Sequence, residues 1–308
     1  MGKHGKVRTA LEYATARALL AGLRFLPRPL AVAAGHGFGR VAYRLAGRLR
    51  STGERNLQLA FPEMEQRERE RILRGCFMNL GRLLGEFSQF PRATPDGLQK
   101  IVECQGLENL QAAQEAGRGV ILFTGHLGAW ELSSFALSAL GYPMSFLVRR
   151  IDNPLVERLV EKTRTRFGNR SIDKRAAMRP MFRTLRAGGI LGILVDLNTQ
   201  PHEGIFVDFF GIPASTTSGL AALALRTGAA VLPVFVPWDE SRQRFILRID
   251  PPLSVAPSGD EKEDVRQLTS RLTAVVETYV RRFPDQWLWI HKRWNTRPEN
   301  ETNLYSSL

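Results

Sequence analysis

Apolar positions recur along the chain in two patterns, one typical of buried strands and one typical of amphipathic helices. Short apolar runs predict strands at 119–124, 144–148, 190–195, 229–236 and 244–249. Apolar residues spaced three and four apart predict helices at 65–90, 128–140, 153–167, 178–187, 220–227 and 261–282. Strands that alternate with helices indicate an α/β fold in which helices flank a central, largely parallel sheet.

The first 50 residues differ from the rest in charge. They hold ten Lys and Arg residues against a single acid, Glu12, and so carry +9 of the formal net charge of +13. Leucines and aromatic residues lie between these charges at helical spacing. Because Glu12, Arg17 and Arg24 interrupt the apolar stretch, we expect an N-terminal helical membrane anchor that lies in the interface of an anionic membrane. The alternative is that these helices pack on the body with solvated arginines.

Composition narrows the classes of function. With 44% hydrophobic and 24% charged residues among 308, the chain resembles ordinary globular proteins. Cys76 and Cys104 are too few for a disulfide framework and too far apart for a metal-type pair. No nucleic-acid-binding fold is recognisable, so we expect no nucleic acid partner. We expect anchoring helices over residues 1–50 and one catalytic domain over residues 51–308.

Several familiar catalytic signatures are missing from the sequence. It contains no phosphate-binding loop, no GxSxG elbow and no HExxH zinc motif. The fragment GFGRVA, at 37–42, loosely fits a dinucleotide fingerprint, but no strand precedes it and no acidic residue follows at the required distance. We therefore expect no metal and no cofactor.

Candidate chemistry is concentrated in the run GHLGAWE, at 125–131, directly after an apolar strand. Five residues on a regular helix turn by about 140° around its axis, so His126 and Glu131 cannot face one site from the same helix. We place His126 in the turn at the carboxyl edge of the sheet, and Glu131 in the first helical turn, where it reaches back to the imidazole. An oriented neutral imidazole is a general base near neutral pH. The alternative is a structural histidine beside a surface glutamate.

The same run resembles the HxxxxE motif of the bacterial lipid A biosynthesis acyltransferases. Four further segments are similar to this family in the same order, and together they cover nearly the whole chain. They are ERNLQLAFPE at 54–63, RRIDNPLVERLVEKTRTRFG at 149–168, LVDLNTQPHEGIFVDFFGIPASTTSG at 194–219 and DQWLWIHKRWNTRP at 285–298.

The resemblance implies catalytic roles for four residues. His126 would deprotonate the acceptor hydroxyl, and Glu131 would orient the imidazole. Arg164 would stabilise the oxyanion or hold a phosphate of the acceptor, and Arg166 is the alternative if the register differs. Asp196, at the end of a buried strand, would organise the site, unless it is only a helix cap or the partner of a structural arginine.

The resemblance also indicates residues that bind substrate. Arg149 and Asn153 match the family in the segment before the helical arginine. Phe209, with Phe206 and Phe210 in the same phenylalanine-rich loop, would line an acyl-chain groove or pack in the core. The hydroxyl residues at 215–218 are interpreted as helix caps rather than nucleophiles.

These observations imply a membrane-associated O-acyltransferase with a glycerolipid acyltransferase-like core, at the cytoplasmic face of the cell inner membrane. Its donor would be an acyl thioester, acyl carrier protein or acyl-CoA, and its lipid acceptor a precursor of lipid A. One alternative is an acyltransferase for another phosphoglycolipid, such as a phosphatidylinositol mannoside, or for a lysolipid. Another is a non-catalytic membrane-binding protein on the same fold. Asn198, Thr199 and Gln200 depart from the charged turn of many members, which leaves the acceptor open.

Overall fold

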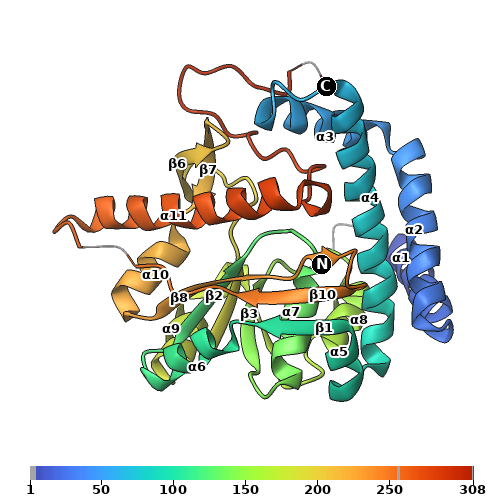
Figure 1. Cartoon of the computed structure of the whole chain (residues 1–308), viewed down its shortest axis with the longest axis horizontal. Helices are drawn as coiled ribbons and strands as arrows, with labels where there is room; N and C mark the ends of the chain where they lie inside the picture. The colour runs from blue at the N-terminus through green and yellow to red at the C-terminus, as the bar shows by residue number, and fades with distance from the viewer. Residues whose placement is uncertain (1–4, 255–256, 307) are drawn as a thin grey trace.

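The computed structural model describes residues 5–254, 257–306 and 308, and an eight-stranded sheet forms its centre (Figure 1). Seven strands lie in the order β1, β10, β8, β2, β5, β3, β4, and β9 pairs with β10. Neighbours along this order are parallel except β10 and β8. The predicted α/β fold with a mostly parallel sheet is therefore confirmed. The strands are β1 (Val102–Gln105), β2 (Val120–Thr124), β3 (Met144–Val148), β4 (Arg170–Asp173), β5 (Ile190–Leu194), β8 (Ala230–Phe235), β9 (Trp238–Asp239) and β10 (Arg244–Ile249).

Helices cover both faces of this sheet. All residues of β2 are buried, and successive side chains of a strand point to opposite faces. Ile121 and Phe123 join a core with α4, α9, α10 and α11, whereas Val120 and Leu122 join a second core with α5, α6 and α7. These helices are α4 (Gln66–Gln89), α5 (Pro95–Ile101), α6 (Leu107–Glu115), α7 (Trp130–Ala139), α9 (Met178–Arg186), α10 (Gly219–Thr227) and α11 (Glu261–Arg282), and α8 (Pro154–Arg164) follows β3. The described residues also form three short 3₁₀ helices: η1 (Phe90–Arg92), η2 (Lys174–Ala176) and η3 (Pro284–Gln286).

The register between β2 and β5 positions the candidate chemistry. Thr124 lies opposite Leu194 in this parallel pair. His126 and Asp196 each follow two positions later. The register therefore brings both residues to one point at the carboxyl edge of the sheet, where open α/β folds bind ligands.

The segment predicted as a phenylalanine-rich loop is instead a β-hairpin. Its strands are β6 (Gly204–Phe209) and β7 (Ile212–Thr217), and they form a separate antiparallel sheet. Phe210 and Gly211 both have positive φ at the turn, as a two-residue hairpin of type I′ requires. The hydroxyl residues at 215–217 lie in β7, and Ser218 makes no side-chain cap bond to α10. The interpretation of 215–218 as caps is therefore wrong.

The N-terminal helices α1 (Lys6–Phe25), α2 (Arg28–Leu45) and α3 (Gly47–Ala60) join the body through α4. A Cβ at Gly35 of α2 would come within 2.1 Å of the carbonyl oxygen of Gly81 on α4, and a Cβ at Gly39 within 2.4 Å of that of Phe77. Glycine is therefore required where the two helices touch. The fragment at 37–42 lies inside α2, so its glycines belong to a helix and not to a nucleotide-binding turn.

Exposed apolar side chains gather on α1, α2 and α3. No helix among the described residues is both long and apolar enough to cross a bilayer. Residues 1–4 of the predicted anchor lie outside the described residues. The exposed side chains are Val7, Leu11, Phe25, Leu30, Phe38, Val41, Leu45 and Leu49.

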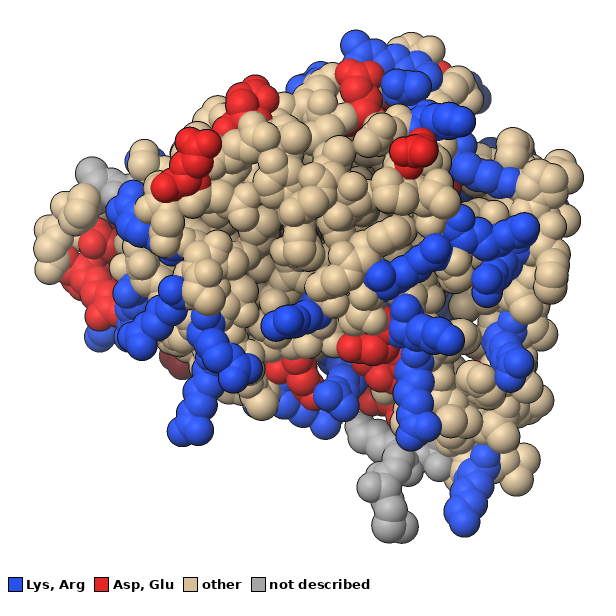
Figure 2. All heavy atoms as spheres, turned by 90° about the horizontal axis from the view of Figure 1, so that it is seen from below, with Lys and Arg blue, Asp and Glu red and all other residues tan. Residues whose placement is uncertain are grey.

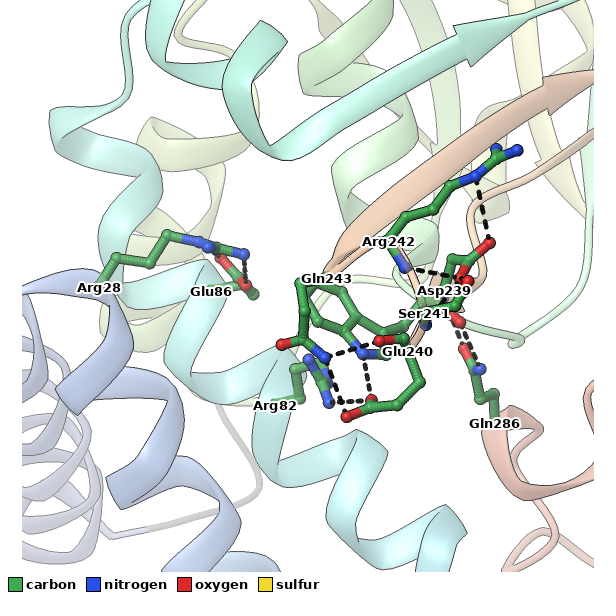
Figure 3. A network of polar contacts seen from close by, with 10 residues as sticks. Arg28, Arg82, Glu86, Asp239, Glu240, Ser241, Arg242, Gln243 and Gln286 are labelled. Atoms are coloured by element: carbon green, nitrogen blue, oxygen red, sulfur yellow. Dashed lines mark hydrogen bonds and ion pairs between the residues drawn. The ribbon is translucent and has the colours of Figure 1, made fainter.

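A polar network ties α4 to the β9–β10 turn and to α2 (Figure 3). The guanidinium of Arg82 lies 3.9 Å from the ring centre of Trp238, and the Trp238 indole donates a hydrogen bond of 2.6 Å to Glu240. On the same helix, buried Glu86 accepts two hydrogen bonds of 3.0 and 2.6 Å from Arg28 of α2. The network therefore fixes α4 to the edge of the sheet and to the N-terminal helices.

Candidate active site

His126 lies in the turn between β2 and α7, as the sequence predicts. Gly128 has a φ of 62°, and a Cβ there would lie 2.2 Å from the carbonyl oxygen of Val236. The backbone N–H of Ala129 donates to that carbonyl at 2.8 Å, and the N–H of Leu288 donates to the carbonyl of His126 at 3.1 Å. The turn is therefore held between the end of β8 and the C-terminal segment.

Asp196, and not Glu131, contacts the imidazole of His126. Its Oδ1 lies 2.7 Å from Nδ1 of His126. Its Oδ2 accepts the backbone N–H of His126 at 2.6 Å and the indole N–H of Trp287 at 2.7 Å. Asp196 thus lies at the site, as predicted, and its neighbour there is the His126 imidazole.

The charge of Asp196 determines the tautomer of His126. Burial by itself raises the pKa of the Asp196 carboxyl, but the His126 imidazole and the hydrogen bonds from His126 and Trp287 outweigh it, so this pKa lies below its ordinary value. An ionised carboxylate only accepts hydrogen bonds, so Nδ1 of His126 carries the proton. In the neutral ring, Nε2 is then the proton acceptor.

Glu131 pairs with Arg164 instead of the imidazole, which corrects the predicted contact. Arg164, the last residue of α8, donates to Glu131 through Nε at 2.9 Å and also through Nη2. Burial lowers the pKa of Arg164, but the hydrogen bond and charge of Glu131 raise it above its ordinary value. Two parallel charge-assisted hydrogen bonds are stronger than one to a neutral ring, and Asp196 already satisfies His126.

A cavity of about 640 Å³ opens beside these residues. Part of its wall is polar, with His126, Glu131, Arg149, Arg164, Lys174, Asn198, Thr199 and His291. Much of the remaining wall is apolar and comes from the sheet and α9, with Leu122, Met144, Phe146, Ile193, Val234, Met178 and Met181. Such a cavity suits a ligand that has both a polar group and an apolar chain.

Arg149 is at the cavity as predicted, whereas two other predicted substrate-binding residues are not. Asn153 caps α8 by accepting the backbone N–H of Leu155 at 3.0 Å, and donates to the carbonyl of Thr9 at 2.9 Å. Arg166 donates to the carbonyl of Phe90 at 3.0 Å. Asn153 links α8 to α1, and Arg166, just after α8, links to η1; neither lines the cavity.

Of the two alternatives for Phe209, the acyl groove and the core, the structure shows the core. The exposed fraction of Phe209 is 1%, and its ring packs edge-on against Phe210 and Trp287, with centroids 4.8 and 5.6 Å apart. The ring of Trp294 also packs against Phe209, with the two centroids 5.7 Å apart. Trp287 is a member of this aromatic cluster, and its indole N–H donates to the Asp196 carboxylate. The cluster therefore packs next to Asp196.

The family model of the bacterial lipid A biosynthesis acyltransferases matches residues 3–296. The chain belongs to this family. A lipid A biosynthesis lauroyltransferase of Escherichia coli is 30% identical over 91% of the chain and 90% of its own length. A lipid A biosynthesis acyltransferase of Haemophilus influenzae is 28% identical over 84% and 80%, and a lipid A biosynthesis myristoyltransferase of Escherichia coli is 27% identical over 85% and 81%. The protein is therefore an acyltransferase enzyme.

In this lipid A biosynthesis acyltransferase, the C-terminal signature contributes site residues for which the sequence suggested no role. Trp287 donates to Asp196. His291 lines the cavity, and its Nε2 accepts the backbone N–H of Asn198 at 3.1 Å. Asn56, from the ERNLQLAFPE segment, donates to the carbonyl of His291 at 2.7 Å. The motifs were visible in the sequence, but their contacts depend on how the C-terminal segment docks.

Proposed function

We propose that this acyltransferase transfers a fatty acyl group from an acyl thioester to a hydroxyl of a lipid A precursor, with His126 as general base. The hydrogen bond between His126 and Asp196 at the cavity carries the proposal. Nε2 of His126 takes the hydroxyl proton while the hydroxyl oxygen bonds to the thioester carbonyl carbon. Collapse of the tetrahedral intermediate breaks the C–S bond, and the leaving thiolate takes the proton from the imidazolium. The products are an ester and a thiol.

The charge of the cavity wall favours a phosphorylated acceptor. Arg149, Arg164 and Lys174 line it. Glu131 neutralises Arg164, and Glu203 pairs with Lys174 at 2.7 Å. Arg149 has no ion-pair partner among the described residues, so it is the cation that we assign to an acceptor phosphate.

We propose acyl carrier protein as the donor and the outer face of α9 as its docking surface. Arg179, Arg183 and Arg186 follow one another at helical spacing, are exposed, and form no ion pair among the described residues. Met178, at the start of the same helix, lines the cavity. An acidic carrier protein bound here would deliver its thioester beside His126.

Charge reversal on α9 tests the donor. The double variant Arg179→Glu and Arg183→Glu should lower kcat/KM for acyl carrier protein at least about tenfold at low salt, and leave kcat/KM for acyl-CoA unchanged. The matched control reverses Arg226, whose charge already pairs with Glu261. Equal use of both donors, with the same salt dependence, would exclude the carrier-protein assignment.

We propose that the N-terminal helices rest on the cytoplasmic face of the inner membrane. The exposed apolar side chains of α1, α2 and α3 support this. In Figure 2, basic side chains gather over the part of the lower face where Figure 1 places α1 and α2. Apolar and basic residues together suit insertion into anionic lipid headgroups.

Vesicle binding tests the membrane surface. Replacing Val41 and Leu45 of α2 by glutamate should reduce sedimentation with vesicles that contain anionic phospholipid. The control is Leu225→Glu, because Leu225 is an exposed apolar residue on α10, away from the N-terminal helices. Unchanged binding by the α2 variant would show that another surface meets the membrane.

Product analysis tests the reaction itself. The wild-type enzyme is incubated with acyl carrier protein or acyl-CoA thioesters and, separately, with a lipid A precursor, a phosphatidylinositol mannoside and a lysophospholipid. The proposal expects one added acyl chain on the lipid A precursor by mass spectrometry, and none with His126→Ala. If only one of the other lipids is acylated, that lipid is the acceptor and the lipid A assignment is wrong. If no combination of donor and acceptor gives a product, a non-catalytic protein is favoured.

A further inference from the structure

His291 is a second histidine at the cavity, and its backbone is fixed on both sides. Its N–H donates to the carbonyl of Leu288 at 3.3 Å, and its carbonyl accepts the side-chain amide of Asn56 at 2.7 Å. The segment that carries it also bonds to the catalytic turn, because the N–H of Leu288 donates to the carbonyl of His126. The two histidines therefore belong to one connected unit.

One hydrogen bond defines the tautomer of His291. The backbone N–H of Asn198 donates to Nε2 at 3.1 Å. Only an unprotonated ring nitrogen accepts such a bond, so the neutral ring carries its proton on Nδ1. Burial lowers the pKa of His291, and the charge of Arg293, with that of His126 when it is protonated, acts in the same direction, against the charge of Asp196. The neutral ring is therefore favoured.

The N–H at Nδ1 of His291 is not engaged by the described part of the protein. It has no hydrogen-bond partner within residues 5–254, 257–306 and 308. Buried polar side-chain atoms without a partner occur, in this part of the chain, only in Arg293, Trp294 and Arg297. Nδ1 of His291 is not among these buried atoms, so it is accessible, and the residue lines the cavity.

Two nearby cations are already engaged. Glu131 binds Arg164 through two hydrogen bonds. Arg293 is buried and donates to the carbonyl of Ser215 at 2.7 Å and to the hydroxyl of Thr216 at 2.5 Å. His291 is a neutral donor held in place before substrate arrives, and such a donor stabilises developing negative charge without reorganisation.

We propose that His291 is a further catalytic residue, whose Nδ1–H donates a hydrogen bond to the carbonyl oxygen of the acyl thioester. The bond strengthens as this oxygen becomes the oxyanion of the tetrahedral intermediate. His291 exchanges no proton in this step, since His126 takes the hydroxyl proton and returns it to the leaving thiolate. This role rests on the proposed acyl transfer.

Two amide variants separate donation to substrate from a structural role. In His291→Gln, the side-chain oxygen reaches the position of Nε2 and accepts the N–H of Asn198, but no N–H stands at the position of Nδ1. In His291→Asn, the amide N–H stands near the position of Nδ1, and the side chain is too short to reach Asn198. His291→Ala lacks both groups.

The proposal expects the Asn variant to keep kcat within about tenfold of wild type. The Gln and Ala variants should lose about 10²–10³ in kcat, with little change in KM for donor or acceptor. Slow hydrolysis of the acyl thioester without acceptor passes through the same oxyanion, so it should fall in parallel. Thermal unfolding of each variant checks that it is folded.

An active Gln variant beside an inactive Asn variant would overturn the proposal, because it would make the bond to Asn198 the only function of His291. An Asn variant as slow as Ala, or a rise in acceptor KM with unchanged kcat, would overturn it too. Wild-type turnover of the lipid A precursor tests the proposed function separately. The His291 variants are compared with wild type on whichever acceptor the enzyme uses. A wrong acceptor and a wrong role for His291 therefore give different results.

Discussion

Asp196 binds His126 at two points, with Oδ1 2.7 Å from the ring nitrogen Nδ1 and Oδ2 2.6 Å from the backbone nitrogen. One carboxylate therefore sets both the orientation of the imidazole and the position of the turn that carries it. Trp287 holds Oδ2 from the other side through its indole N–H. The ring cannot rotate away from Asp196 without losing its only hydrogen bond among the described residues.

Asp196→Asn should reverse the tautomer of His126. Both the backbone N–H of His126 and the indole N–H of Trp287 need an acceptor, so the amide oxygen takes the place of Oδ2. The amide NH₂ then faces Nδ1, the ring proton moves to Nε2, and the base is lost. We expect kcat to fall by about 10³–10⁴-fold. Steady-state assays measure this, with exposed Asp96→Asn as control, and near wild-type activity would contradict the assignment.

His126→Ala should abolish transfer and leave the protein folded. The side chain stands in a turn at the edge of the sheet and belongs to neither hydrophobic core, so its removal leaves the core packing intact. We expect a loss of at least about 10²–10⁴ from removal of the positioned base. Exposed His202 gives the control variant His202→Ala. A folded His126→Ala protein that still transfers acyl chains would refute the catalytic role.

Glu131 and Arg164 should behave as one unit. Removal of either leaves a partly buried charge without its partner, so Glu131→Ala and Arg164→Ala should each lower kcat/KM by about 10²-fold. The double variant should be little worse than either single variant. Arg164→Lys should retain only part of the wild-type kcat/KM, because an ammonium cannot form two parallel hydrogen bonds with a carboxylate. Kinetic assays of all four variants check this, and additive losses would show that the two residues act independently.

Gly35→Ala should destabilise the contact between α2 and α4. Its Cβ would meet the carbonyl oxygen of Gly81 at 2.1 Å, so the helices must separate. We expect a loss of about 1–3 kcal/mol in the free energy of unfolding in urea. Gly37→Ala on the same helix is the control: open space surrounds Gly37, so the change should stabilise by about 0.5–1 kcal/mol. Equal effects of the two changes would argue against this packing.

Stability should fall in acid partly through Asp196. Its pKa in the folded protein lies below the ordinary value of 3.8, so ionised Asp196 stabilises the folded state above that pH. This contribution is lost as the pH falls through the folded pKa. The free energy of unfolding of wild type should therefore decrease more steeply below about pH 4 than that of Asp196→Asn. Urea titrations at several pH values measure both slopes, and parallel curves would contradict the prediction.

The sequence by itself determined the elements whose pattern is local. The strand at 244–249 and the helix at 261–282 begin and end where predicted, because burial on one or both faces leaves a period in the sequence. The same reasoning placed His126 in a turn, since a buried strand ends before it and a helix begins after it. The family motifs added the acyltransferase chemistry.

Only the tertiary structure decided which side chains meet. Glu131 is five positions from His126, yet the register of β2 and β5 places Asp196 against the imidazole. Arg164, at the end of α8, binds Glu131 instead. Phe209 enters the core because 204–217 folds as a hairpin whose turn requires positive φ at adjacent residues. Local periodicity reports which face of an element is buried. It carries no information on strand register or on the docking of distant segments, and these set the partners of a catalytic group.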